Sequence, residues 1–111
     1  MIDKYFGLKD GDIEIIISIL KKYIQIEQAL IFGSRAKGNY KPGSDVDIVL
    51  KGCVHEVITD ISFSLNEDSL LPYKFDVLDY DSISNQNLID HINRVGIVFY
   101  EKGKCGSMQQ E

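Results

Sequence analysis

The feature that most constrains the fold is a pair of short apolar runs joined by a loop that contains two Gly-Ser pairs. The first run, residues 28–32 (QALIF), ends at Gly33, and the second, residues 45–51 (DVDIVLK), begins with two aspartates one residue apart. Short apolar runs that are bounded by turn residues are typical of buried strands. We therefore expect two core strands, with a pair of carboxylates at the start of the second one.

Helical and strand patterns alternate around these two runs. Apolar residues recur at helical spacing over residues 11–24 and 54–66, where Asp10 or Asp12 is suited to cap the first helix. Residues 73–80 predict a third strand, residues 86–96 a last short helix and residues 97–102 a further strand. We expect one domain over residues 1–102, followed by a polar and disordered tail at 103–111.

Composition narrows the classes of function. The formal net charge of −5 argues against sequence-independent nucleic-acid binding, which needs a surplus of Lys and Arg along the contact face. No apolar run approaches the roughly 20 residues that span a bilayer, and the N-terminal segment lacks the pattern of a signal peptide. These features predict a cytoplasmic protein in which Cys53 and Cys105 are reduced thiols.

The two aspartates are expected to act together. Residues i and i+2 of a strand point to the same face, so Asp45 and Asp47 present their carboxylates side by side. Asp76 lies in the third predicted strand and can face them if the strands are neighbours. Such an oxygen-only set suits Mg²⁺. Asp79 is close enough in sequence to be the third carboxylate instead, although Asp79-Tyr80-Asp81 is otherwise predicted to be a solvated turn.

The loop before the aspartates supplies the complementary half of a site. Gly33 and Ser34 follow a strand, where backbone N–H groups can converge on an anion, and the Ser34 hydroxyl adds a donor. Arg35 and Lys37 add positive charge beside them. A phosphate-binding loop followed by metal-binding carboxylates predicts a site for a nucleoside triphosphate with Mg²⁺. The loop is neither a Walker A sequence nor a G-x-G-x-x-G fingerprint.

Gly33-Ser34, ten further residues, Asp45-Val46-Asp47 and a later Asp76 together resemble the signature of the minimal nucleotidyltransferases of the DNA polymerase beta superfamily. The resemblance implies an α+β, palm-like fold, in which a small mixed sheet has helices packed on one face. It implies that Gly33 and Ser34 hold the triphosphate, with Arg35, Lys37 and Ser44 as further nucleotide-binding candidates. Asp45 and Asp47 would bind two Mg²⁺ ions, for which Mn²⁺ can substitute, and Asp76 would be a ligand of the catalytic metal and a candidate base.

The resemblance extends to a partner. Family members of this size resemble the antitoxin subunit of pairs with a helical HEPN protein, to whose tyrosine they transfer AMP from ATP. Tyr40, Phe99 and Tyr100 are the candidates for a partner-facing surface of a homo- or hetero-oligomer. Two alternatives stay open: a catalytic subunit that modifies a small molecule such as an aminoglycoside, and a nucleotide-binding module without turnover.

Overall fold

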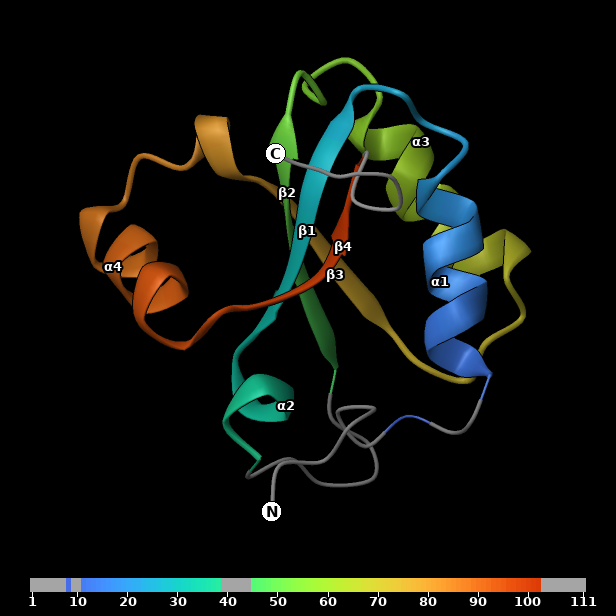
Figure 1. Cartoon of the computed structure of the whole chain (residues 1–111), viewed down its shortest axis with the longest axis horizontal. Helices are drawn as coiled ribbons and strands as arrows, with labels where there is room; N and C mark the ends of the chain where they lie inside the picture. The colour runs from blue at the N-terminus through green and yellow to red at the C-terminus, as the bar shows by residue number, and fades with distance from the viewer. Residues whose placement is uncertain (1–7, 9–10, 39–44, 103–111) are drawn as a thin grey trace, which may run out of the picture.

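The computed structural model describes residues 8, 11–38 and 45–102. Within these ranges the chain is built around one four-stranded sheet (Figure 1). Its elements, in chain order, are α1 (Asp12–Leu20), β1 (Ile26–Phe32), α2 (Ser34–Lys37), β2 (Val46–Gly52), α3 (Ile58–Phe63), the π-helical turn η1 (Ser64–Asp68), β3 (Phe75–Asp79), the 3-10 turn η2 (Tyr80–Ser82), α4 (Gln86–Val95) and β4 (Ile97–Glu101). The predicted α+β class is confirmed.

The sheet is mixed, with the strand order β3-β2-β1-β4. Strand β1 runs antiparallel to both of its neighbours, β2 and β4, whereas β2 and β3 are parallel. Parallel neighbours need a long crossover connection, and here α3 and η1 provide it. One consequence matters for the site: β1 ends at the same end of the sheet at which β2 and β3 begin (Figure 1).

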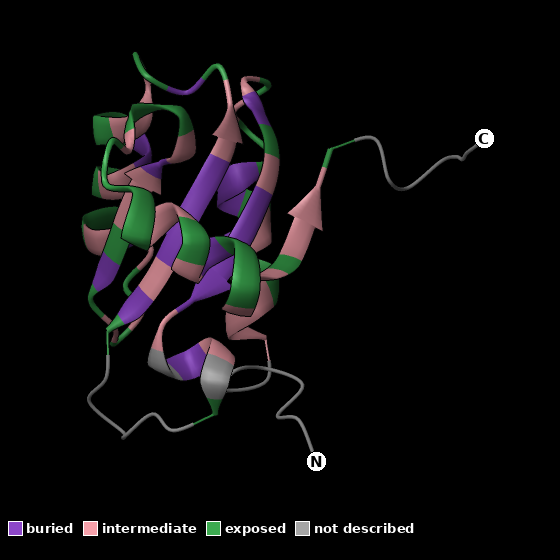
Figure 2. Cartoon of the chain, turned by 90° about the vertical axis from the view of Figure 1, so that its left-hand side faces the viewer, coloured by how far each residue is buried: buried purple, intermediate pink, exposed green. Residues whose placement is uncertain are grey.

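Each face of the sheet has its own apolar cluster. The larger cluster lies under α1 and α3, and its members include Ile16, Leu20, Ala29, Ile31, Ile48, Leu50, Ile61 and Phe75. The smaller cluster lies under α4 and consists of Leu30, Phe32, Val49 and Ile92. The longest buried stretches of the central strands are residues 29–32 of β1 and 48–50 of β2, and Figure 2 shows such buried stretches in purple.

The arrangement of the helices differs from the expectation in one detail. Helices α1 and α3 share one face, but α4 packs on the opposite face through Ile92 (Figure 1). The physical reason lies in β1 and β2, whose alternate side chains are apolar on both faces. A strand that is apolar on both faces must be covered on both, and α4 covers the second one.

Several boundaries also differ. Helix α1 ends at Leu20 rather than continuing to residue 24, because two short turns follow it, from Lys22 N–H to Ile19 C=O and from Tyr23 N–H to Leu20 C=O. Its N-cap is Gly11, at φ +89°, and not an aspartate. The helix predicted at residues 54–66 begins only at Ile58, and after Phe63 it continues as the π-helical turn η1 to Asp68. The helix α2 was not expected, since four residues leave no periodic signal long enough to read.

No helix among the described residues is long and apolar enough to cross a membrane. Cys53 is exposed and is a free thiol. The predicted tail at 103–111 and Cys105 lie outside the described residues.

Candidate active site

Strand pairing brings two of the predicted aspartates together. Asp47 of β2 is the register partner of Asp76 on the parallel neighbour β3, and of Phe32 on the antiparallel neighbour β1. Neighbouring strands lie about 4.8 Å apart, so the Asp47 and Asp76 side chains stand next to each other on one face. This is the α4 face, because Phe32 belongs to the cluster under α4. Asp45 directly precedes β2 and is exposed, as is Asp76.

Gly33 holds the end of β1 against Asp47. Its backbone is at φ +76°, a conformation that side-chain-bearing residues rarely adopt. A Cβ at this position would collide with Oδ2 of Asp47. Glycine is therefore required here twice, once for the turn and once for the close approach of the carboxylate.

The electrostatic environment at this end of the sheet disfavours the ionised form of the Asp47 carboxylate. Burial raises its pKa above the ordinary value, and the neighbouring Asp76 and Asp45 raise it further. Arg35 acts in the opposite direction and lowers it. Like charges held this close favour any cation that can neutralise them. The arrangement is thus suited to a metal ion or to another positive group.

Arg35 is turned into the protein. Its residue exposure is only 3%, and its guanidinium carbon lies 5.3 Å from the ring centre of Tyr73, in the geometry of a cation–π contact. The Tyr73 hydroxyl donates a hydrogen bond of 2.7 Å to Oδ2 of Asp12. Arg35 thereby connects α2 to the segment before β3 and to the start of α1. The sequence predicted only that a strand begins at Tyr73, since contacts between such distant residues leave no local pattern.

The sequence matches the model of a known protein family. Residues 14–104 match the family model described as polymerase beta, nucleotidyltransferase. The matched range contains Gly33, the three aspartates and every strand of the sheet. The chain belongs to this nucleotidyltransferase family. No curated protein sequence matches it significantly.

Solved structures share the nucleotidyltransferase fold. A chain of a structure described as a toxin–antitoxin with AMP-PNP has a TM-score of 0.68 at 20% identity, over 84% of this chain and 76% of that one. A putative nucleotidyltransferase from Sulfolobus solfataricus has a TM-score of 0.54 at 21% identity, over 86% and 81%. A chain from the complex of a tri-AMPylated Shewanella oneidensis HEPN toxin with an MNT antitoxin has a TM-score of 0.60 at 18% identity, over 81% and 70%. At such identities the likeness establishes the fold.

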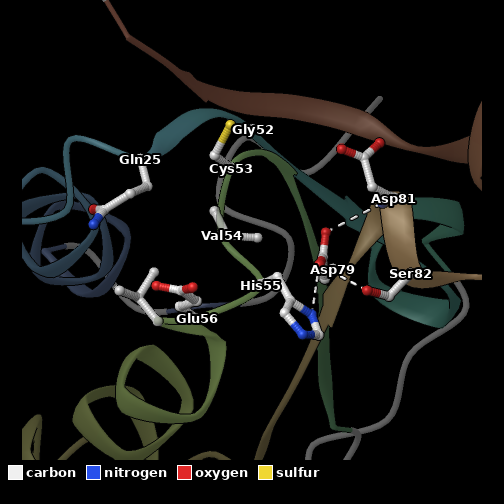
Figure 3. A pocket seen from close by; sticks show the side chains of 10 residues that line it. Gln25, Gly52, Cys53, Val54, His55, Glu56, Asp79, Asp81 and Ser82 are labelled. Carbon is white, nitrogen blue, oxygen red and sulfur yellow. Dashed lines mark hydrogen bonds and ion pairs between the residues drawn. The ribbon is translucent and has the colours of Figure 1, made fainter.

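Within the nucleotidyltransferase domain, Asp76 and Asp79 lie at opposite ends of β3. Asp79 is 8% exposed, and its carboxylate accepts hydrogen bonds from the Asp81 backbone N–H at 3.2 Å and from the Ser82 hydroxyl at 2.8 Å (Figure 3). The interpretation of residues 79–81 as a solvated turn is therefore wrong for Asp79, because two donors of η2 allow its carboxylate to be buried. Of the two alternatives for the third carboxylate, it is Asp76 that stands beside Asp47.

The remaining predicted residues fall partly outside the described structure. Ser34 and Lys37 belong to α2, but only their backbone is described, and Tyr40 and Ser44 lie in the undescribed segment 39–44. Among the described residues, no group of three His, Cys, Asp or Glu side chains is close enough to hold a metal ion.

Proposed function

We propose that this chain is a Mg²⁺-dependent nucleotidyltransferase that transfers a nucleoside monophosphate, AMP from ATP, to a hydroxyl group. The observation that carries the proposal is the arrangement of Asp47, which is packed against Gly33 and lies in register with Asp76 at the end of β1. A nucleotidyltransferase domain with this carboxylate set favours an enzyme over a nucleotide-binding module without turnover.

In the proposed reaction the acceptor oxygen forms a bond to the α-phosphorus, and the bond from that phosphorus to pyrophosphate breaks. Gly33, with the N-terminal backbone of α2, would hold the triphosphate, and Asp45 and Asp47 would hold Mg²⁺. The bound metal would stabilise charge on the phosphate oxygens and lower the pKa of the attacking hydroxyl. Asp76, exposed beside Asp47, would accept the hydroxyl proton.

We propose further that the acceptor is a tyrosine of a helical HEPN-type protein, so that the chain acts as an antitoxin. The fold is shared with chains from structures described as toxin–antitoxin complexes, including one with a tri-AMPylated HEPN toxin, which supports this choice. The predicted partner-facing aromatics do not add to it. Phe99 and Tyr100 are half-buried against the core under α1 and α3, and Tyr40 lies outside the described residues.

The chemistry is tested with two labels. The chain is co-expressed with a helical HEPN-type protein, purified by pull-down, and incubated with ATP and Mg²⁺. Label from [α-³²P]ATP should appear on the partner, whose intact mass should rise by one or more AMP groups, whereas label from [γ-³²P]ATP should not transfer. Transfer of the γ label would indicate a kinase-type reaction and would refute the proposal. Modification of an added aminoglycoside instead of the partner would favour the small-molecule alternative.

The metal requirement is tested separately from the acceptor. Mg²⁺ or Mn²⁺ should raise the melting temperature, and more so with AMP-PNP, since a ligand that binds only the folded state at 100 times its Kd stabilises by about 2.7 kcal/mol. The gain should disappear in the Asp45→Asn/Asp47→Asn variant. Equal stabilisation of the wild type and this variant would place the metal elsewhere.

A further inference from the structure

The side chain of Asn66 pairs with the backbone of the residue that precedes Asp76. Its Oδ1 accepts the N–H of Phe75 at 2.8 Å, and its Nδ2 donates to the C=O of Phe75 at 3.0 Å. Both backbone groups of Phe75 are thus satisfied by one amide. This two-bond pairing also fixes which end of the amide is nitrogen, because the N–H needs an acceptor and the C=O needs a donor.

The pairing lies on the free edge of β3. In the parallel ladder, Val46 is the register partner of Phe75, and the Val46 N–H donates to the C=O of Lys74 at 2.8 Å. In this pattern the backbone groups of Phe75 itself point away from β2. β3 is the last strand in the order β3-β2-β1-β4, so within the described part of the chain Phe75 has no neighbouring strand on that side. Asn66 stands where a further strand would otherwise be.

Ser62 also forms hydrogen bonds with the side-chain amide of Asn66. Nδ2 of Asn66 also donates to the Ser62 C=O at 3.0 Å, and Ser62 Oγ lies 3.3 Å from it. The π-helical turn η1, closed by the bond from Ser69 N–H to Ser64 C=O at 3.0 Å, carries Asn66 alongside the strand. Single π-helical turns of this kind are frequent at functional sites.

We propose that Asn66 is a positioning residue for Asp76. β3 begins at Phe75, so Asp76 is only the second residue of an edge strand, in a region where strands tend to fray. With Asn66 on one edge and β2 on the other, this segment is held from both sides. Asp47, by contrast, lies on the central strand β2 and needs no such support.

The kinetic consequence rests on the proposed function. Asn66→Ala should lower the rate of AMP transfer to the co-purified partner on the order of 10- to 100-fold, because small misplacements of a reacting group are this costly. The affinity for Mg²⁺ with AMP-PNP should stay close to that of the wild type, since Gly33, Asp45 and Asp47 are untouched. A loss of kcat without a loss of nucleotide affinity separates positioning from general destabilisation.

Ser69→Ala is the matched control. The Ser69 hydroxyl donates to the Leu65 C=O at 2.6 Å and accepts the Leu71 N–H at 3.2 Å, so its removal also costs two hydrogen bonds next to η1. It does not bond to Phe75. Ser69→Ala should therefore lower stability and leave kcat unchanged. Equal kcat losses in Asn66→Ala and Ser69→Ala would overturn the proposal.

Combining Asn66→Ala with Asp76→Asn tests whether the two residues act on the same step. If Asn66 works through Asp76, Asn66→Ala should add little to the loss already caused by Asp76→Asn. Fully additive losses would overturn the proposal.

Amide hydrogen exchange tests the pairing of Asn66 with the Phe75 backbone without any catalytic assay. In the wild type the Phe75 N–H should exchange slowly although it faces the edge of the sheet, and Asn66→Ala, which removes the Oδ1 acceptor of that N–H, should speed exchange at Phe75 and Asp76. Fast exchange at Phe75 in the wild type would overturn the proposal. If the wild type transfers no nucleotide, the proposed function fails, and the exchange measurement still decides whether Asn66 holds this strand.

Discussion

The two ends of strand β3 each carry an aspartate, and the protein treats the two carboxylates differently. Asp76 is exposed and lies in register with Asp47, whose pKa is raised by burial and by its acidic neighbours. Asp79 is 8% exposed and accepts hydrogen bonds from the Asp81 N–H and the Ser82 hydroxyl. At the Asp76 end of the strand, carboxylates of like charge lie close together. At the Asp79 end, hydrogen bonds stabilise a single carboxylate.

The different surroundings of the two carboxylates provide a criterion for distinguishing a functional carboxylate from a structural one. A pocket of about 520 Å³ lies beside Asp79, lined also by His55 and Glu56 (Figure 3). The carboxylate in it already has two donors and requires no ligand to be stable there. The surroundings of Asp47 differ, because the neighbouring carboxylates of Asp76 and Asp45 raise its pKa while Arg35 lowers it. This repulsion, rather than the size of a pocket, makes the Asp47 end of the strand the candidate for cation binding.

The largest effect should come from removing the charge of Asp47. Asp47→Asn should lower AMP transfer roughly 10³-fold, since charge stabilisation by a metal is worth several kcal/mol. The melting temperature should hold or rise, because burial and two acidic neighbours disfavour the ionised carboxylate. Label transfer and thermal unfolding are measured together. Asp81→Asn, which neutralises an exposed carboxylate at the other end, is the control and should change neither. A fall in stability that parallels the loss of activity in Asp47→Asn would make Asp47 structural.

Gly33→Ala should affect both stability and activity. Forcing alanine into a left-handed conformation costs about 1–2 kcal/mol, and its Cβ would also push the Asp47 carboxylate aside. Gly11→Ala isolates the first effect, since Gly11 has φ +89° but no atom within 4 Å of the new Cβ. Both variants should melt earlier, and only Gly33→Ala should lose transfer activity. Full activity in folded Gly33→Ala would mean that the contact with Asp47 is irrelevant to the reaction.

Much of the structure around Asp47 and Gly33 could be predicted from the sequence. The alternation of apolar and acidic residues in DVDIVL predicts a strand with two carboxylates on one face, and β2 begins within one residue of that prediction. Glycine at the end of an apolar run predicts a sharp turn, which the structure has at Gly33. Such features are local, so that spacing and residue type carry them.

The remainder depends on contacts between distant segments. The burial of Arg35 under Tyr73 joins α2 to the approach of β3, and the bonds from Asn66 to Phe75 join η1 to its edge. Neither pair has a periodicity or a spacing that reports it. Asp79 was misread for the same reason: its burial depends on the register of β3 and on the donors of η2, which only the fold brings together.

Asp79→Ala should affect stability and spare the chemistry. It leaves the Asp81 N–H and the Ser82 hydroxyl without their acceptor, at a cost of about 1–3 kcal/mol. For a domain of this size each kcal/mol lowers the melting temperature by roughly 4–8 °C. Below the melting temperature, AMP transfer should match the wild type. A loss of transfer in folded Asp79→Ala would erase the distinction between the two ends of β3.

The smallest effect should come from His55, which faces Asp79 across the same pocket. Its Nδ1 lies 3.9 Å from Oδ2 of Asp79, but its side chain is 85% exposed. An exposed pair at this distance is screened by water and salt, and it is typically worth less than about 1 kcal/mol. His55→Gln should therefore shift the urea midpoint only slightly, and less at high salt, when measured below the pH range in which histidine ordinarily loses its proton. A loss as large as that of Asp79→Ala would show that the buried carboxylate depends on a charge partner as well as on its two hydrogen bonds. The two ends of β3 would then differ in which cation neutralises them, a protein side chain at Asp79 and a bound ion at Asp47, rather than in whether one is needed.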